Sequence, residues 1–337
     1  MQLNRNEIEA QQPSIDKLIG QKLPVLDHGF VRVIDYMGSD DAVVQAARVS
    51  YGKGTKKTSE DRGLIRYLMR HRHSTPFEMC EIKLHVKLPI FVARQWVRHR
   101  TANINEYSAR YSIMDKDFYV PDRSYLAAAI QNSRSATKRE VKKREGQEDL
   151  FNEEPGKVVE LTATARQSLA NKQGRDGTLE EAEALEHLET ITQTSNRAYK
   201  AYEKLLNESE GAVLQAGRDG LARELARMVL PTNYYTQWYW KIDLHNLLNF
   251  ITLRADSHAQ FEIQEYARAI LSIVKAWVPI TYEAFVDYRQ EAMLFSRAEL
   301  ALLKCLLRGE SITQTGSGLT PREWREFQTK IGDVNKT

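Results

Sequence analysis

An alternation of apolar and polar residues over residues 79–88 constrains the fold of this chain more than any other feature. The apolar members are Cys80, Ile82, Leu84, Val86 and Leu88, and the polar members between them are Glu81, Lys83, His85 and Lys87. Side chains of a strand point alternately to its two faces, so this period predicts a strand with one buried face. Pro89 suits the first turn of a helix, which we expect to run to about Arg98.

The remaining segments predict a mixture of helices and strands without a regular strand–helix–strand rhythm. Strands are expected over Phe30–Tyr36 and, in an aromatic stretch, Thr232–Lys241. Helices are expected over Ala42–Val49 after a cap at Ser39, from Thr58 or Ser59 to His71, over Leu179–Thr190, from about Ile191, over Asp219–Val229, from Asp243 to Arg254, and over Ser257–Trp277, the longest. This order predicts an α+β fold with a mixed or antiparallel sheet packed against helices.

A length of 337 residues leaves open one main domain with appendages or two domains, and we expect the first. We expect an N-terminal extension over residues 1–24, the main domain over 25–290 and a helical tail over 291–337. Residues 131–190 hold 10 basic and 13 acidic side chains in 60 positions, so they are interpreted as a charged insertion within the main domain.

Composition excludes several classes of protein. The chain has 48 Lys and Arg against 45 Asp and Glu, a net charge of +3, which argues against a dedicated nucleic-acid binder. Two cysteines, Cys80 and Cys305, cannot form a disulfide framework or a four-cysteine zinc site. No apolar run is long enough to span a membrane and the N-terminus does not resemble a signal peptide, so we expect a cytoplasmic protein.

The net positive charge is concentrated between Arg94 and Arg110, where four arginines face one acid. Arg98, His99 and Arg100 fall at the predicted end of a helix, and cations there can simply complement the helix dipole. Three adjacent cationic side chains repel one another, however, and an anionic ligand would relieve this repulsion. The amides and the carboxylate of the loop that follows suit the edge of a heterocycle, and together with the guanidinium groups they suggest a nucleotide.

These residues resemble the signature of flavin-dependent thymidylate synthases, RHR followed after seven positions by Ser. The fuller pattern is also present, with Glu106, Ser108 and Arg110 in their places. Three further segments resemble the family in the same order: Gln95-Trp96, His73 to Glu78, and Leu253 to Gln260. The resemblance covers about residues 25–125 and 195–290 and leaves the insertion and the tail outside.

The resemblance implies synthesis of dTMP from dUMP, with methylenetetrahydrofolate as carbon donor, FAD as hydride carrier and NADPH as reductant. It also implies a homotetramer with shared active sites. The expected dUMP-binding residues are Gln95, Trp96, Val97, Arg98, Glu106, Tyr107, Ser108, Ala109, Arg110, Arg227 and Arg254. The expected FAD-binding residues are Thr75, from a neighbouring chain, and Arg98, His99, Arg100, Glu106, Asp243, Leu244, His245 and Asn249. Some family members carry Asn and Arg where this chain has Asp243 and His245.

Two of these residues are the expected catalytic ones. Arg254 would lie against the uracil ring and favour ionisation at N3, because a fixed guanidinium stabilises developing negative charge. In the family the role of Ser108 is either nucleophile or binding hydroxyl, and we favour binding because the sequence places no base beside it. Neither cysteine is well placed to be a nucleophile.

Alternatives to this interpretation stay open at this point. His71 and His73 lack further ligands at familiar spacing, so no metal site is predicted. The aromatic residues around Trp238 could stack on bases, although core packing is the commoner use of such a strand. A rival hypothesis is that the chain binds nucleic acid or a partner through the arginines of residues 94–110, without flavin chemistry; its binding would weaken steeply with salt.

Overall fold

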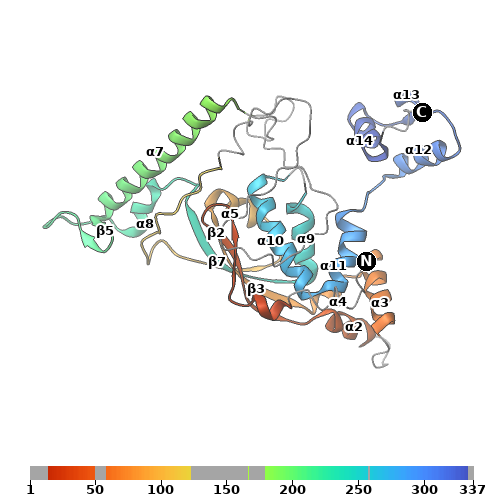
Figure 1. The fold of residues 1–337 in the computed structure, drawn as a ribbon, viewed down its shortest axis with the longest axis horizontal. Helices are drawn as coiled ribbons and strands as arrows, with labels where there is room; N and C mark the ends of the chain where they lie inside the picture. Colours follow the sequence, from red (N-terminus) through yellow and green to blue (C-terminus); the bar gives the residue numbers. More distant parts are fainter. Residues whose placement is uncertain (1–13, 50–57, 123–165, 167–178, 257–258, 333–337) are drawn as a thin grey trace, which may run out of the picture. The chain divides into compact units, whose positions relative to one another are not determined.

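The structure is a computed structural model that describes residues 14–49, 58–122, 166, 179–256 and 259–332. Contacts divide the chain into two compact units, Met1–Tyr282 and Glu283–Thr337. The first unit contains the main sheet and the helices that pack on it, and the second is helical (Figure 1). The predicted α+β class with an antiparallel sheet is confirmed.

Among the described residues, five strands form the main sheet in the order β1-β2-β3-β7-β4, and every neighbouring pair is antiparallel. The strands are β1 (Lys22–Val25), β2 (Gly29–Met37), β3 (Glu81–Pro89), β7 (Tyr235–Asp243) and β4 (Asn103–Glu106). The sequence predicted β2, β3 and β7, because each of them carries apolar or aromatic residues at strand spacing. Strands β5 (Glu208–Ser209) and β6 (Ala212–Val213) form a separate hairpin.

The two edge strands of the main sheet were not predicted. The short helix η1 (Ile15–Leu18) and all of β1 except its last residue lie within residues 1–24, which we expected to form an extension. Ile15 and Leu18 are buried, so residues 14–24 belong to the fold. Strand β4 lies in the polar loop of the arginine cluster, and all four of its residues are exposed. It forms because it pairs with β7, not because of an apolar face of its own.

One face of the sheet is buried and centres on Trp96. The rings of Trp238 and Trp240, from β7, lie 5.8 and 5.1 Å from the Trp96 ring, and that of Phe250 lies 4.6 Å away. The apolar residues of β3 lie on this same face, as their alternation predicts. The helices α5 (Ile90–Trp96), α9 (Leu244–Arg254) and α10 (Phe261–Trp277) supply the covering layer (Figure 1).

The first unit contains further helices. They are α2 (Asp40–Val49), α3 (Thr58–Arg70), α4 (Thr75–Glu78), α7 (Glu181–Leu206), α8 (Arg223–Ala226), η2 (Arg227–Val229) and the start of α11 (Pro279–Phe285). Helix α7 is a single helix of 26 residues, where we expected two. It is therefore longer than α10, which begins at Phe261 and not at Ser257. As predicted, the Asp243 side chain caps α9 by accepting from the Asn246 amide at 2.9 Å.

The second unit contains η3 (Val286–Gln290), α12 (Arg297–Leu307), α13 (Gln314–Ser317) and α14 (Pro321–Ile331). Capping boxes start both α12, at Ser296 and Glu299, and α14, at Thr320 and Glu323. A helical tail is thus present, although its boundary with the first unit falls at residue 283. Most of the predicted charged insertion lies outside the described residues; its last part forms the start of α7.

A buried carboxylate joins α2 to α11. Asp40 accepts from the Ile280 amide at 2.8 Å, from the Thr281 amide at 2.9 Å and from the Thr281 hydroxyl at 2.6 Å. Asp40→Ala is expected to lower the free energy of unfolding by about 2–4 kcal/mol, because buried donors lose their acceptor. Urea unfolding of the full chain measures this. The exposed neighbour is the control: Asp41→Ala should cost less than about 1 kcal/mol, and an equal cost for both would contradict the prediction.

Candidate active site

The loop that carries the signature residues is fixed at its start to β7 and at its far end to the turn before β7. At its start, Glu106 of β4 pairs with Trp238, and the Tyr107 amide donates to the Gln237 carbonyl at 2.8 Å. At its far end, the Tyr119 amide donates to the Asn233 carbonyl at 2.8 Å. Residues 107–119 therefore form a loop whose ends are held by the same strand and by the turn before it.

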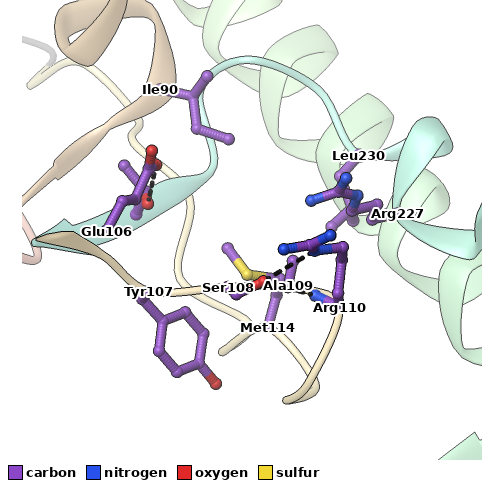
Figure 2. A pocket seen from close by; sticks show the side chains of 10 residues that line it. Ile90, Glu106, Tyr107, Ser108, Ala109, Arg110, Met114, Arg227 and Leu230 are labelled. Carbon is purple, nitrogen blue, oxygen red and sulfur yellow. Dashed lines mark hydrogen bonds between the residues drawn. The ribbon is translucent and has the colours of Figure 1, made fainter. Parts of the chain in front are cut away.

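This loop forms one wall of a cavity of about 370 Å³. The lining residues are Ile90, Glu106, Tyr107, Ser108, Ala109, Arg110, Met114, Arg227, Leu230 and Thr236 (Figure 2). Six of the expected dUMP-binding residues are among them: Glu106, Tyr107, Ser108, Ala109, Arg110 and Arg227. The structure thus brings Arg227, distant in the sequence, to the signature loop.

The cavity has a cationic side and a carboxylate side. Figure 2 shows the guanidinium groups of Arg110 and Arg227 on one side of the cavity and Glu106 on the other. The Thr236 hydroxyl donates to Glu106 Oε1 at 2.7 Å. Paired guanidinium groups suit a phosphate, and a fixed carboxylate can accept from an N–H or a hydroxyl of a ligand. This arrangement suits a molecule with an anionic end and a hydrogen-bonding end.

Ser108 lies between these two sides. Its Oγ accepts from the Arg110 amide and from Arg110 Nε, both at 3.4 Å. In the part of the chain that the structure describes, no histidine, lysine or carboxylate forms a hydrogen bond with this hydroxyl. A serine nucleophile needs an adjacent base, so the geometry suits a binding hydroxyl better.

A second group of expected site residues gathers where α5 and α9 end. Arg254, half-buried, donates from Nη2 to the Gln95 carbonyl at 3.2 Å. Burial lowers the pKa of Arg254, and it also lowers the pKa of His99, an effect to which the Arg254 charge adds. The His99 ring packs edge-on against Phe250 at 5.5 Å. Arg254 Nε and Gln95 Oε1 are buried polar atoms without a hydrogen-bond partner in the described structure.

Other expected site residues are placed differently. The Trp96 and Leu244 side chains are fully buried in the core, so contacts from these two residues to a ligand can come only from the backbone. The Asp243 carboxylate is engaged at the start of α9, where Asn246 Nδ2 also donates to it at 2.7 Å. The residues Thr75, Val97, Arg98, Arg100 and Asn249 are exposed and His245 is half-buried. Ser257 and His258 lie outside the described residues.

Four lining residues of the cavity were missed by sequence reasoning: Ile90, Met114, Leu230 and Thr236. Thr236 lies on the buried face of β7 together with Trp238 and Trp240, so the alternation of that strand was the available signal. The other three are apolar residues: Ile90 and Leu230 come from segments distant from the loop in the sequence, and Met114 lies within the loop. None of them stands in a pattern that distinguishes a pocket wall from the core.

The described residues also bear on the membrane and metal predictions. Within them, no helix is both long and apolar enough to cross a bilayer. Among the same residues, no three or more His, Cys, Asp or Glu side chains gather where they could hold a metal ion.

Comparison with known proteins decides the family. Residues 32–280 match the family described as thymidylate synthase complementing protein. The chain is 52% identical over 320 residues to a flavin-dependent thymidylate synthase of Ruegeria pomeroyi, a match that covers 95% of this chain and 91% of that protein. The chain belongs to the flavin-dependent thymidylate synthase family. A family member from Rickettsia bellii is 50% identical over 321 residues, which cover 95% of this chain and 96% of that one.

Solved structures support this membership. The UMP/dUMP methylase PolB from Streptomyces cacaoi, bound with 5-Br dUMP, is 28% identical with a TM-score of 0.60, over 80% of this chain and 99% of that one. The same methylase bound with 5-Br UMP is 30% identical with a TM-score of 0.58, over 80% of this chain and 98% of that one. The predicted family and enzyme class are therefore confirmed: members are methyltransferases that use a flavin.

The similarity to these synthases extends further than the sequence motifs indicated. The 5% of the chain outside the Ruegeria match is shorter than either the predicted insertion or the tail. Both segments are therefore matched at least in part by family members. Our expectation that they lie outside the family resemblance is wrong.

Proposed function

We propose that this chain converts dUMP to dTMP by reductive methylation, with FAD as hydride carrier, NADPH as reductant and methylenetetrahydrofolate as carbon donor. The observation that carries the proposal is the cavity itself. The signature loop and Arg227, more than a hundred residues away in the sequence, line one space with two guanidinium groups facing a fixed carboxylate. A nucleoside monophosphate has the matching phosphate and heterocycle.

In this proposal, the residues of the cavity bind and orient dUMP. Arg110 and Arg227 would bind the phosphate, and Ser108 Oγ would add a hydroxyl contact. Glu106, held by Thr236, would accept a hydrogen bond from the nucleoside. Arg254 would stabilise negative charge on the uracil as N3 loses its proton, because a half-buried guanidinium is held in place before the charge develops.

The residues around His99 fit a flavin dinucleotide. Arg98 and Arg100 are exposed beside the buried His99 ring, so they can bind the pyrophosphate while the His99 side chain stays in the protein. The buried, unpartnered Arg254 Nε and Gln95 Oε1 leave hydrogen-bonding capacity for a polar ligand here. When bound, FAD would supply the hydride. We further propose a cytoplasmic homotetramer in which Thr75 contacts the FAD of a neighbouring subunit; family membership supports this assembly.

Purification and a visible spectrum test the function. The expected result is a yellow protein whose colour bleaches with NADPH and which forms dTMP from dUMP when methylenetetrahydrofolate is added. A colourless protein that takes up no FAD and forms no dTMP would contradict the proposal. Phosphate-dependent binding of nucleic acid that falls steeply with salt, in the same preparation, would instead favour the rival hypothesis.

Removal of both thiols is expected to leave turnover within about twofold of the wild type, because reactive cysteines need an exposed thiolate. Cys80 is fully buried on the apolar face of β3, and burial raises the pKa of its thiol to about 11. Cys305 lies in the second unit, on α12. The Cys80→Ala/Cys305→Ala variant should therefore keep its rate of dTMP formation in a steady-state assay. A loss of a hundredfold or more would point to a thiol nucleophile.

A further inference from the structure

The wall of the cavity formed by Met114 is held from outside by helix α7. Met114 is buried, and it lies only four residues after Arg110 in the signature loop. The Tyr199 hydroxyl donates to the Met114 carbonyl at 3.1 Å, and the Met114 amide donates to the Tyr202 hydroxyl at 3.4 Å. Both backbone polar groups of one residue are thus bound by two side chains of a single helix.

The spacing, burial and protonation of the two tyrosines suit this contact. They lie three positions apart on α7, so they share one face of the helix. Tyr199 is 7% exposed and Tyr202 is fully buried, so neither hydroxyl can exchange the backbone for bulk water. Burial raises the pKa of Tyr199 to about 12 and also raises the pKa of Tyr202, which keeps both hydroxyls protonated.

The same pair is connected to a second wall of the cavity. The Tyr199 ring stacks on Tyr234 with a centroid distance of 5.8 Å and an interplanar angle of 4°. The Tyr234 carbonyl accepts from the Ile90 amide at 2.8 Å, and Ile90 also lines the cavity. Next to α7, Arg223 Nη1 donates to the Tyr111 carbonyl at 2.6 Å. Three side chains from residues 199–223 therefore bind the backbone of the loop between Arg110 and Met114.

We propose that Tyr199 and Tyr202 are positioning residues for dUMP binding, which act by fixing the backbone of Met114 and thereby the place of Ser108 and Arg110. The inference rests on the proposed function, since it assigns a role within the same site. Of Tyr199, Tyr202 and Met114, only Met114 lines the cavity. Loss of the hydroxyls would leave the aromatic packing in place while the loop samples other positions.

The test uses Tyr199→Phe, Tyr202→Phe and the double variant in the full-length enzyme loaded with FAD. Each single variant is expected to raise the KM for dUMP and its dissociation constant about 3–10-fold, and the double variant tenfold or more, roughly as expected for one or two lost hydrogen bonds. The kcat at saturating dUMP should stay within about twofold, because the reacting groups are unchanged once dUMP is bound. Calorimetry with dUMP and steady-state assays give these values.

The matched control is Tyr266→Phe. Tyr266 is also fully buried and also donates to a backbone carbonyl, that of Lys87 at 2.7 Å, but it does not line the cavity. A melting temperature lowered as much as in the control, with unchanged dUMP affinity, would show that the α7 pair is only structural and would overturn the inference. If the wild type itself binds no dUMP, the proposed function fails; unchanged affinity in the variants of a binding wild type overturns this inference alone.

Discussion

Replacing Arg254 by Ala is expected to lower the kcat for dTMP formation by about 10²–10³-fold, the usual effect of removing a preorganised group that stabilises developing charge. Arg254 is half-buried, and its Nη2 is held by the Gln95 carbonyl. The guanidinium is therefore oriented before the substrate ionises, and its burial strengthens the interaction with a charge on the uracil. Single-turnover measurement at saturating dUMP and reduced FAD separates this step from binding.

Two further variants make the Arg254 test specific. Arg254→Lys keeps the positive charge but loses the planar fork, so it should recover only part of the rate. Arg322→Ala, which removes an exposed arginine paired with Glu326 in the second unit, should leave kcat unchanged within about twofold. A kcat for Arg254→Ala equal to that of the wild type would remove Arg254 from the chemical step, whatever its effect on KM.

The sequence predicted those elements whose local residue types already indicate which side chains are buried or where a helix begins. Strand β3 was evident because its apolar and polar residues alternate, and the structure places the apolar ones on the buried face. The start of α9 was evident because Asp243 is a residue type that caps helices, and it does so. In each case the interaction that shapes the element, burial of one face or capping by a side chain, involves residues of that element itself. The local sequence was therefore sufficient to predict it.

Strand β4 and the start of α10 could not be predicted from the local sequence. The β4 residues are exposed and polar, and they become a strand only because β7 offers an unpaired edge. Helix α10 begins at Phe261, whereas the sequence predicted a start at Ser257. Pairing and packing with distant segments determine whether β4 forms and where α10 begins. Neither effect can be recognised from the local sequence.

The candidate site also has residues that the sequence predicted and residues that it did not. The signature loop was found by its residue types, since clustered arginines with a carboxylate and a serine already indicate an anionic ligand. Met114 and Leu230, in contrast, are ordinary apolar residues that reach the cavity through the packing of α7 and of the turn before β7. The sequence also did not predict that α7 supports the loop, because tyrosines spaced three apart on a helix are most often core residues.

Removing both guanidinium groups of the cavity is expected to weaken dUMP binding by about 10²–10³-fold, and each single variant, Arg110→Ala or Arg227→Ala, by about 10–100-fold. Both groups are held through Nε, which donates to Ser108 Oγ at 3.4 Å in Arg110 and to the Glu224 carbonyl at 3.2 Å in Arg227. The terminal nitrogens would then bind the phosphate. Calorimetric titration of the FAD-loaded enzyme with dUMP measures the loss.

Deoxyuridine, which lacks the phosphate, provides the internal control for this pair. The variants should bind deoxyuridine as well as the wild type does, because the arginines act only on the missing group. The double variant should lose less than the product of the two single effects, since both side chains contact one phosphate. Equal weakening for dUMP and deoxyuridine would instead mean that the arginines support the shape of the loop and do not bind the phosphate. Because Arg110 and Arg227 are exposed, added salt should weaken dUMP binding in the wild type and have less effect in the double variant.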